Sequence, residues 1–376
     1  MIILIIVGYN YDIYRSESPI EYVISVAESF DKSPKGIFNR AWRIIKNNYV
    51  DESCNNQNWN KWKARYKNNI KTYADSHLVI ETILASLDDP YSKFLSKKEF
   101  EQQHRNIDAK LYGVGIFITE ISGKVIIVSV IDDSPAQKYG LKKKDEIIKI
   151  DSISIKGLSF KKIVDYIKGK KDSMVVLTIL RDGKTIVKRI LRGEIKIQTV
   201  KHKLLDNNIA YIKISSFICF DTADEFKKAL EAVSKAKGLI IDVRGNYGGL
   251  LSNAVYITNM FIKDGNIVSM VDRTGKQQDF LAMPNDFMTS KPVVILINEA
   301  SASASEIFSG ALKDHKRAVL VGEKTFGKGK IQMIFKLPDS SGINLTIAKY
   351  LTPAGKDIDH KGIKPDYTIE FDKNEL

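Results

Sequence analysis

A serine-rich turn and a lysine between two glycines lie near each other toward the end of the chain. The stretch runs from Asn298 to Gln332 and reads Asn-Glu-Ala-Ser-Ala-Ser-Ala-Ser-Glu-Ile, then a helical segment, then Gly-Glu-Lys-Thr-Phe-Gly-Lys-Gly-Lys-Ile-Gln. A serine hydroxyl attacks a carbonyl only when a neighbouring base takes its proton. A lysine is such a base when burial lowers its pKa toward the working pH. These residue types therefore suggest a serine nucleophile activated by a lysine.

The elements around this stretch would place Ser303 at the start of a helix. Residues 293–297 form a short apolar run, as expected for a buried parallel strand. The apolar residues of 306–312 have the spacing of an amphipathic helix. Free amides at the start of a helix can stabilise an oxyanion. Taken alone, however, a Ser-Ala-Ser-Ala-Ser run is most often a helix cap and a close-packed helix start.

Histidine, the usual base for a serine, is poorly placed in this sequence. His315 should lie on the same helix as Ser303 and about 18 Å from it at ~1.5 Å per residue, outside hydrogen-bond reach. The sequence around the other histidines does not resemble that of a catalytic triad. These histidines are His77, His104, His202 and His360. Lys328 remains as a candidate base, although a lysine in a glycine-rich loop is by itself more often a solvated charge.

These motifs resemble the core of the carboxyl-terminal processing proteases, also called tail-specific proteases. The similarity includes Gly-Ala-Leu-Lys-Asp between the serine and lysine motifs, and it extends from about residue 36 to about residue 370. It implies that Ser303 is the nucleophile, that Lys328 is the base and that Gln332 helps to hold the lysine. The resemblance also implies a crotonase/Clp-like α/β protease core within an α+β multidomain protein, with no cofactor and no metal.

The composition is that of a protein with a substantial core and a basic surface. The chain has 376 residues, of which 44% are hydrophobic, and a net charge of +13. This length suffices for two or three domains. The basic residues are spread along the chain without the signature of a nucleic-acid module, so we expect no nucleic-acid partner and at most a weak attraction to membrane surfaces. Cys54 and Cys219 indicate neither a disulfide framework nor a metal site.

Residues 1–17 begin with the apolar run Met1–Val7. This run is too short to span a bilayer, which takes about 20 residues, and it has no basic segment before it. It is either the remnant of a signal peptide or membrane anchor, or a short ordered element. The resemblance favours export in a bacterium, to the periplasm or cell envelope, with association with the inner membrane through the N-terminus.

Residues 18–105 are expected to form an N-terminal helical region. Apolar residues recur there at three- and four-residue spacing, and they are Ile37, Ala41, Ile44, Ile45, Ile80, Ile83, Leu84 and Leu87. Apolar positions left exposed on these helices would allow two chains to pair as a homodimer. Residues 87–92, Leu-Asp-Asp-Pro-Tyr-Ser, resemble the loop before the PDZ domain in this family.

Residues 106–194 resemble a PDZ domain inserted before the protease core. A glycine loop with exposed amides can hold a carboxylate, and the strand after it offers an edge for an added peptide strand. The residues that match the carboxylate-binding loop are Tyr112, Gly113, Val114, Gly115 and Ile116. We expect Ile163, Val164 and Ile167 to form the helix face beside the peptide groove.

Lys168 is a departure from the family pattern. Relatives often have an arginine at this position, before the glycine that follows the groove helix. The resemblance makes Lys168 a candidate sensor that couples peptide binding to activation. A lysine keeps the charge but loses the planar fork of an arginine, so the coupling is expected to be altered.

Residues 195–376 are expected to form the protease core. Residues 238–243 form a buried strand, and Arg-Gly-Asn-Tyr-Gly-Gly follows it as a loop that enters a helix. In an α/β sheet such strand-to-helix turns meet at the carboxyl edge, where sites form. The glycine pair resembles the family's oxyanion loop. The amide of Ala304 and that of Gly249, which we favour slightly over Gly248, would then hold the oxyanion.

The resulting hypothesis is a serine endopeptidase whose PDZ domain binds the apolar C-terminal tails of protein substrates and whose Ser-Lys dyad cleaves them. One rival is a PDZ adaptor on a catalytically silent protease core. The intact set of Ser303, Lys328 and Gln332 argues against it, because an adaptor would be free to lose these residues. Another rival is an acyl-CoA enzyme of related core fold, which the PDZ-like insertion and the Ser-Lys pair disfavour.

Overall fold

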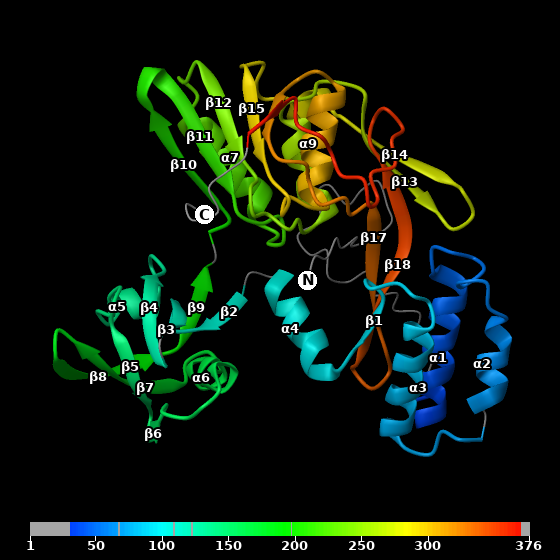
Figure 1. Ribbon diagram of the computed structural model, residues 1–376, viewed down its shortest axis with the longest axis horizontal. Helices are drawn as coiled ribbons and strands as arrows, with labels where there is room; N and C mark the ends of the chain where they lie inside the picture. Colours follow the sequence, from blue (N-terminus) through cyan, green and yellow to red (C-terminus); the bar gives the residue numbers. More distant parts are fainter. Residues whose placement is uncertain (1–30, 67, 108–109, 122, 197, 370–376) are drawn as a thin grey trace. The chain divides into compact units, whose positions relative to one another are not determined.

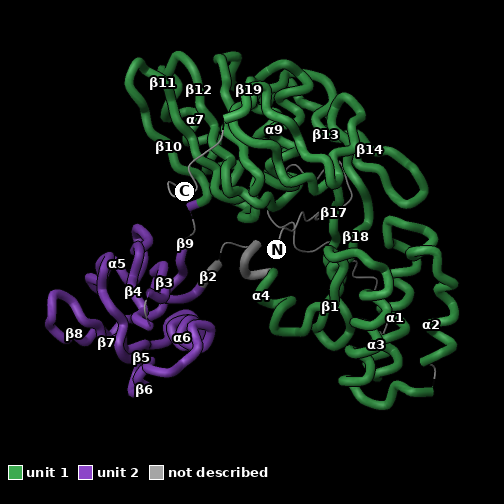
Figure 2. Tube along the Cα trace, viewed as in Figure 1, with its two compact units in different colours: residues 1–104, 199–376 green, residues 105–198 purple. Residues whose placement is uncertain are grey.

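The computed structural model describes residues 31–66, 68–107, 110–121, 123–196 and 198–369 (Figure 1). The chain forms two compact units, one of residues 1–104 and 199–376 and the other of residues 105–198 (Figure 2). The second unit is therefore inserted into the first. The expectations for residues 1–17 lie outside the described residues.

Helices dominate the N-terminal part of the first unit. They are α1 (Pro34–Asn48), α2 (Trp59–Tyr66), α3 (Tyr73–Ala85) and α4 (Lys97–Ile107). Ser33 caps α1 by accepting a hydrogen bond from the amide of Gly36, and Thr72 forms a capping box with Asp75 at the start of α3. The predicted apolar positions of α1 and α3 are buried. The region is not entirely helical, because it contains the short strand β1 (Lys93–Leu95), which pairs with the core strand β18 (Gly342–Leu351).

The inserted unit is a small sheet structure with a hydrophobic core of its own. Its strands are β2 (Lys110–Gly113), β3 (Ile116–Ile121), β4 (Lys124–Val130), β5 (Glu146–Ile150), β6 (Ile153–Ser154), β7 (Met174–Arg181), β8 (Lys184–Leu191) and β9 (Gly193–Lys196), and its helices are α5 (Pro135–Lys138) and α6 (Phe160–Ile167). The main sheet has the order β3-β4-β5-β7-β8, and β2 pairs with β9. Asp182 and Gly183 both have positive φ, which suits the tight hairpin turn between β7 and β8.

A mostly parallel sheet carries the predicted protease core. Its strands, in spatial order, are β10 (Val200–Leu205), β11 (Ile209–Ile214), β12 (Gly238–Asp242), β15 (Val293–Ile297), β16 (Val319–Gly322) and β19 (Tyr367–Thr368). All neighbouring pairs are parallel except β10 with β11. The associated helices are α7 (Thr222–Ala232), α8 (Leu251–Asn259) and α9 (Ala304–Asp314). The turns after β12 and β15 therefore lie at the same edge of the sheet, as the sequence predicts.

A second, antiparallel sheet completes the first unit. It contains β1, β13 (Asn266–Asp272), β14 (Gln277–Leu281), β17 (Lys330–Lys336) and β18 (Gly342–Leu351). Strand β18 pairs with β1, β13 and β17 and is buried along most of its length. Because β1 pairs with β18, the loop before β1 is held against the core. Strand β17 begins directly after the loop that contains Lys328.

Candidate active site

Ser303 occupies a strained turn between β15 and α9. Its φ is 58° and its ψ is −114°, a conformation that residues with a Cβ atom seldom adopt. The side chain is fully buried, and among the described residues its Oγ has no hydrogen-bond partner. The backbone carbonyl of Ser303 accepts a hydrogen bond from the Tyr350 hydroxyl at 3.2 Å. The fold thus holds an unpartnered hydroxyl at the amino end of a helix, an arrangement typical of nucleophiles.

Lys328 is fully buried in the loop between β16 and β17. Burial lowers its pKa to about 7, although the charges of Asp89, Glu306 and Asp359 act in the opposite direction. The Lys328 Nζ atom lies 4.7 Å from the ring centroid of Tyr91. A lysine with this pKa is partly neutral at physiological pH, which is the condition for a general base.

The glycines beside Lys328 are required by close packing. A Cβ atom on Gly327 would lie 2.7 Å from the amide nitrogen of Gly362. A Cβ atom on Gly329 would lie 2.8 Å from the amide nitrogen of Asp359. The loop can therefore pack against residues 359–362 only because no side chain flanks the lysine.

Glu306 connects the serine turn to the lysine loop. Its buried carboxylate accepts hydrogen bonds from the amides of Ser303 at 2.8 Å, Gly327 at 2.7 Å and Lys328 at 2.9 Å. It also accepts one from the Thr325 hydroxyl at 2.6 Å. Burial raises the pKa of Glu306, and these hydrogen bonds partly offset the increase. From the sequence, Glu306 was predicted only as part of a helix, yet its place three residues after Ser303 is a capping-box signal.

Gln332 lies on β17 and is fully buried. Its Nε2 atom donates to the Thr346 hydroxyl at 3.2 Å, and its Oε1 atom has no partner among the described residues. The amide of Thr346 donates to the Ser92 hydroxyl at 3.0 Å, and that hydroxyl donates to the Asp89 carboxylate at 2.6 Å. Gln332 thus belongs to the network around the base, while its role in holding Lys328 stays a prediction.

The loop of residues 87–92 contributes to the surroundings of the base, which sequence reasoning missed. Its Tyr91 ring lies beside Lys328, and the charge of the buried Asp89 opposes the lowering of the lysine pKa. Asp89 also lies 3.9 Å from the Lys330 ammonium group. The Asp-Asp-Pro-Tyr-Ser motif was the available signal, but only the pairing of β1 with β18 shows that this loop reaches the site.

The two glycines of the predicted oxyanion loop have different neighbours. A Cβ atom on Gly248, whose φ is 96°, would lie 2.9 Å from Ser303 Cβ and 3.0 Å from the Ala304 amide nitrogen. A Cβ atom on Gly249 would instead lie 2.2 Å from the carbonyl carbon of Phe217. The Gly248 amide donates to Asn246 Oδ1 at 2.9 Å. The structure therefore brings Gly248 and Ala304 next to Ser303, while the identity of the second oxyanion donor stays a prediction.

Asn246 connects the two turns and was not singled out from the sequence. Its backbone carbonyl accepts hydrogen bonds from the Ala302 amide at 3.0 Å and the Ser305 hydroxyl at 2.8 Å. Its side-chain amide donates to the Ile214 carbonyl at 2.8 Å. The buried asparagine thus fixes the glycine loop against the turn that carries Ser303.

The predicted carboxylate-binding loop lies at the junction of β2 and β3 in the inserted unit. Tyr112 and Gly113 end β2, Val114 and Gly115 form the loop, and Ile116 begins β3. Gly115 has a φ of 84°, and a Cβ atom there would lie 2.3 Å from Ser134 Cβ. Ile163 and Ile167 are buried and Val164 is partly exposed on α6.

Lys168 is exposed at the end of α6, and an arginine from elsewhere in the chain caps that helix. The guanidinium group of Arg192 donates to the carbonyls of Tyr166 at 2.8 Å and Ile167 at 2.9 Å. A Cβ atom on Gly169 would lie 2.6 Å from Arg192 Nε. Arg192, rather than Lys168, thus occupies the space beside this glycine, and a sensor role for Lys168 stays a prediction.

Comparisons with known protein families match most of the chain. Residues 208–369 match peptidase family S41, residues 113–190 match a PDZ domain, and residues 30–82 match the tricorn protease C1 domain. The PDZ match falls within the inserted unit of residues 105–198. The S41 match contains both Ser303 and Lys328.

Individual relatives agree with the family matches. A carboxyl-terminal-processing protease of Synechocystis sp. is 35% identical over 345 residues, which cover 88% of this chain and 80% of the relative. A chloroplastic C-terminal processing peptidase of Tetradesmus obliquus is 33% identical, covering 89% and 77%.

The solved structure of a photosystem II D1 C-terminal processing protease has a similar fold. Its TM-score is 0.62 at 32% identity, with 90% of this chain and 94% of that chain covered. The resemblance seen in the motifs is thus confirmed by sequence and by fold. Together with the PDZ unit and the S41 match, these relatives show that the chain belongs to the carboxyl-terminal processing proteases of peptidase family S41.

Proposed function

We propose that the protein cleaves peptide bonds with Ser303 as the nucleophile and Lys328 as the general base. The observation that carries this proposal is that one buried carboxylate holds two segments together, one with an unpartnered serine hydroxyl and one with a buried lysine whose pKa is lowered to about 7. The Glu306 carboxylate accepts hydrogen bonds from the backbone amides of both residues, and it therefore fixes the distance between the two backbone segments. In this reaction neutral Lys328 takes the Ser303 proton as Oγ attacks the scissile carbonyl carbon.

The remaining steps follow from the same groups. The amide of Ala304 and that of Gly249 or Gly248 stabilise the negative charge on the tetrahedral intermediate. Protonated Lys328 then donates its proton to the leaving amine, and the acyl-enzyme forms as the C–N bond breaks. Water, deprotonated by Lys328, attacks the ester and releases Ser303. Hydrogen bonds between catalytic groups often tighten only when substrate binds, which agrees with a resting Ser303 hydroxyl that has no partner.

Within this proposal, the PDZ unit selects substrates by their C-terminal tails. The backbone of the Gly113–Gly115 loop would bind the terminal carboxylate, and the edge of β3 would pair with the tail as an added strand. Ile163 and Ile167 are buried in the core of this unit, so the preference for tails with apolar ends is proposed from the resemblance to the family alone. Protein substrates with such tails are therefore the proposed partners.

Replacement of the nucleophile tests the proposal. Ser303→Ala should abolish cleavage of an unfolded reporter protein with an apolar tail, while binding of the tail peptide should survive. Ser309→Ala is a matched control, because Ser309 is also a buried serine on α9 with an unpartnered hydroxyl. It should cleave the reporter at close to the wild-type rate. Full activity of Ser303→Ala would contradict the assignment.

A further inference from the structure

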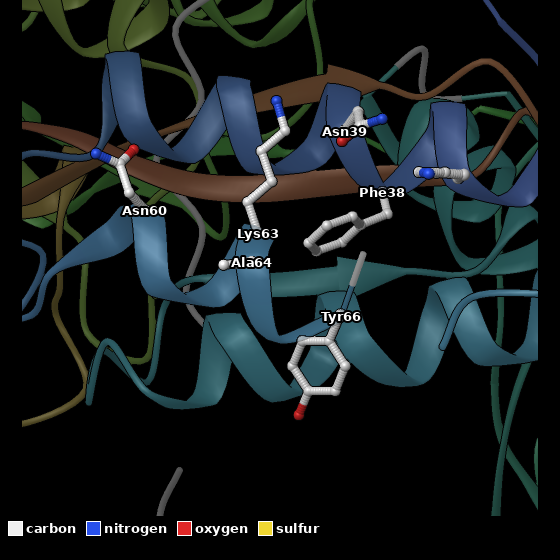
Figure 3. Close-up of a pocket in the computed structure, with 7 residues that line it drawn as sticks. Phe38, Asn39, Asn60, Lys63, Ala64 and Tyr66 are labelled. Carbon is white, nitrogen blue, oxygen red and sulfur yellow. The ribbon is translucent and has the colours of Figure 1, made fainter. Parts of the chain in front are cut away.

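A pocket lies between helices α1 and α2, and the proposed reaction does not use it. It has a volume of about 360 Å³, and α1 and α2 contribute its lining residues Lys35, Phe38, Asn39, Asn60, Lys63, Ala64 and Tyr66. Phe38 extends from α1 toward α2, and Lys63 extends from α2 toward α1 (Figure 3). Ser303 and Lys328 lie on other elements of the same unit. The pocket therefore requires an explanation of its own.

Reciprocal hydrogen bonds hold the two helices together. The indole of Trp42 donates to the Trp59 carbonyl at 3.0 Å, and the indole of Trp59 donates to the Trp42 carbonyl at 3.2 Å. Both tryptophans and Phe38 are buried. The pocket is thus formed by a fixed helix pair with an aromatic floor, and a ligand would not have to create it.

The helix pair carries only positive charge. Helix α1 contributes Lys35, Arg40, Arg43 and Lys46, helix α2 contributes Lys61, Lys63 and Arg65, and neither helix contains an acidic residue. Lys35 and Lys63 are exposed on the lining of the pocket, beside two asparagine amides. Ammonium groups and amides around an apolar floor suit an anion that is attached to an apolar group.

Two other classes of anionic partner fit this surface poorly. An extended peptide binds through an open strand edge, and the two helices use their backbone groups internally. Single-stranded nucleic acid needs exposed aromatic faces for its bases. The Trp42 and Trp59 rings are buried, and the partly exposed rings of Trp62 and Tyr66 already stack on each other and lie beside Arg65. Neither chemistry makes use of a pocket with an apolar floor and a cationic rim.

The neighbouring helix α3 exposes two large side chains, although it carries Asp75 and Glu81 and no lysine or arginine. On α3, Tyr73 is 51% exposed and Leu78 is 63% exposed. The Tyr73 hydroxyl donates to the Lys32 carbonyl at 3.2 Å, which places it beside the segment that leads into α1. Exposed tyrosine close to basic segments is typical of surfaces that rest on a bilayer. Among the described residues, no helix has the length and apolarity needed to cross a membrane.

We propose that the pocket between α1 and α2 binds the headgroup of an anionic phospholipid, so that this helix pair docks on a membrane surface. Lys35 and Lys63 would contact the phosphate, and Phe38, Ala64 and Tyr66 would contact the adjoining glycerol and acyl carbons. Clusters of four to eight basic residues are sufficient for such binding, and each basic residue near the surface increases partitioning by about fivefold.

Vesicle binding by the full chain tests this site. The probes are vesicles of phosphatidylcholine alone and vesicles with roughly one third phosphatidylglycerol, used at physiological salt where distant charges are screened. We expect the wild type to bind the anionic vesicles and not the neutral ones. The double variant K35E/K63E should lower the partition coefficient by about tenfold or more. The control K227E/K228E, with the same change of charge on exposed lysines of α7, should stay within about twofold of wild type.

A neutral variant separates the pocket from general surface charge. Ala64→Gln keeps every charge and a good helix former, but fills the pocket. It should weaken binding severalfold and leave thermal stability and reporter cleavage unchanged. Equal binding by K35E/K63E and K227E/K228E, or no preference of the wild type for anionic vesicles, would overturn the proposal. Unchanged binding of Ala64→Gln would overturn the pocket as the binding site.

Discussion

Burial of Lys328 gives a residue that is ordinarily a surface cation the lowered pKa that its proposed role as a base requires. The fold removes water from the ammonium group and lowers its pKa to about 7, while three carboxylates nearby limit the decrease. Without those charges the lysine would be neutral over a wider pH range, and without burial it would stay protonated. The value near neutrality is therefore the result of two opposing effects.

The pH dependence of cleavage should report this pKa. Because the base must be neutral to take the Ser303 proton, kcat/KM should rise with pH and reach half its limiting value near pH 7. The measurement is the rate on the tailed reporter over a pH series in which the thermal melt shows a folded protein. A rate that falls across this range would be incompatible with a lysine base.

Replacement of the lysine should stabilise the fold while it abolishes activity. Unfolded Lys328 keeps its proton up to about pH 10.5, whereas the folded residue loses it near pH 7. The unfolded state binds more protons between these values, so wild-type stability rises with pH there, and the full cost of burial is present below pH 7. Lys328→Met removes that cost, and we expect its Tm at about pH 7 to rise by several degrees.

The control for this stability change is Lys324→Met, which replaces an exposed lysine of the same loop. Its Tm should stay close to that of wild type, since exposed substitutions usually change stability by less than about 0.5 kcal/mol. The advantage of Lys328→Met should shrink as the pH approaches 10, because the unfolded wild type then loses its proton as well. A lower Tm for Lys328→Met than for wild type at neutral pH would mean that burial of Lys328 does not destabilise the fold.

Local spacing was enough to place Ser303 at a strand-to-helix turn and to reject His315 as its base. In the structure His315 ends α9, and its Nε2 atom pairs with the Asn266 carbonyl at 2.7 Å. The contacts of Glu306 and Asn246 were not predictable in the same way. Each of these residues contacts segments that are far apart in sequence. The local residue pattern of one sequence does not indicate such contacts.

Helix α9 and the lysine loop are held together by the single carboxylate of Glu306. Four donors converge on it from the serine turn, Thr325 and the lysine loop. A glutamine at this position has one acceptor oxygen and would turn an amide donor toward other donors. The element that carries the nucleophile and the element that carries the base would then lose their common anchor.

Glu306→Gln should therefore reduce both stability and activity. We expect a loss of about 1–3 kcal/mol in the free energy of unfolding, because buried donors lose their acceptor, and a decrease of at least tenfold in kcat, because the dyad is misplaced. Denaturant melts and reporter kinetics measure the two effects. Glu323→Gln, on the neighbouring loop, should leave both unchanged. Wild-type kcat in Glu306→Gln would show that the anchor does not set the geometry of the dyad.

At the level of elements, periodicity predicted the helices α1 and α3 and the strands that flank the serine turn. It did not predict β1, because this strand has only three residues and forms by pairing with β18, more than two hundred residues away in sequence. That pairing holds the loop with Tyr91 and Asp89 near Lys328. A short strand with a distant partner has no periodic signature of its own.

In the proposed function, recognition and chemistry belong to different units of the molecule. The inserted unit of residues 105–198 has a separate hydrophobic core, and the residues of the dyad belong to the other unit. An insertion of this kind can be recognised from its glycine loop and its helix face, since both are local. The capping of α6 by Arg192, in contrast, depends on a contact between distant strand and helix ends.

We propose that the protein binds the C-terminal tail of a substrate protein and cleaves that protein with a Ser-Lys dyad. Cleavage of two unfolded reporters, one ending in an apolar tail and one in Asp-Asp, tests this most directly, with wild type, Lys328→Met and Lys324→Met as the enzymes. We predict that wild type and Lys324→Met cleave the apolar-tailed reporter preferentially and that Lys328→Met, though folded, cleaves neither. Cleavage by Lys328→Met at the wild-type rate would contradict the account.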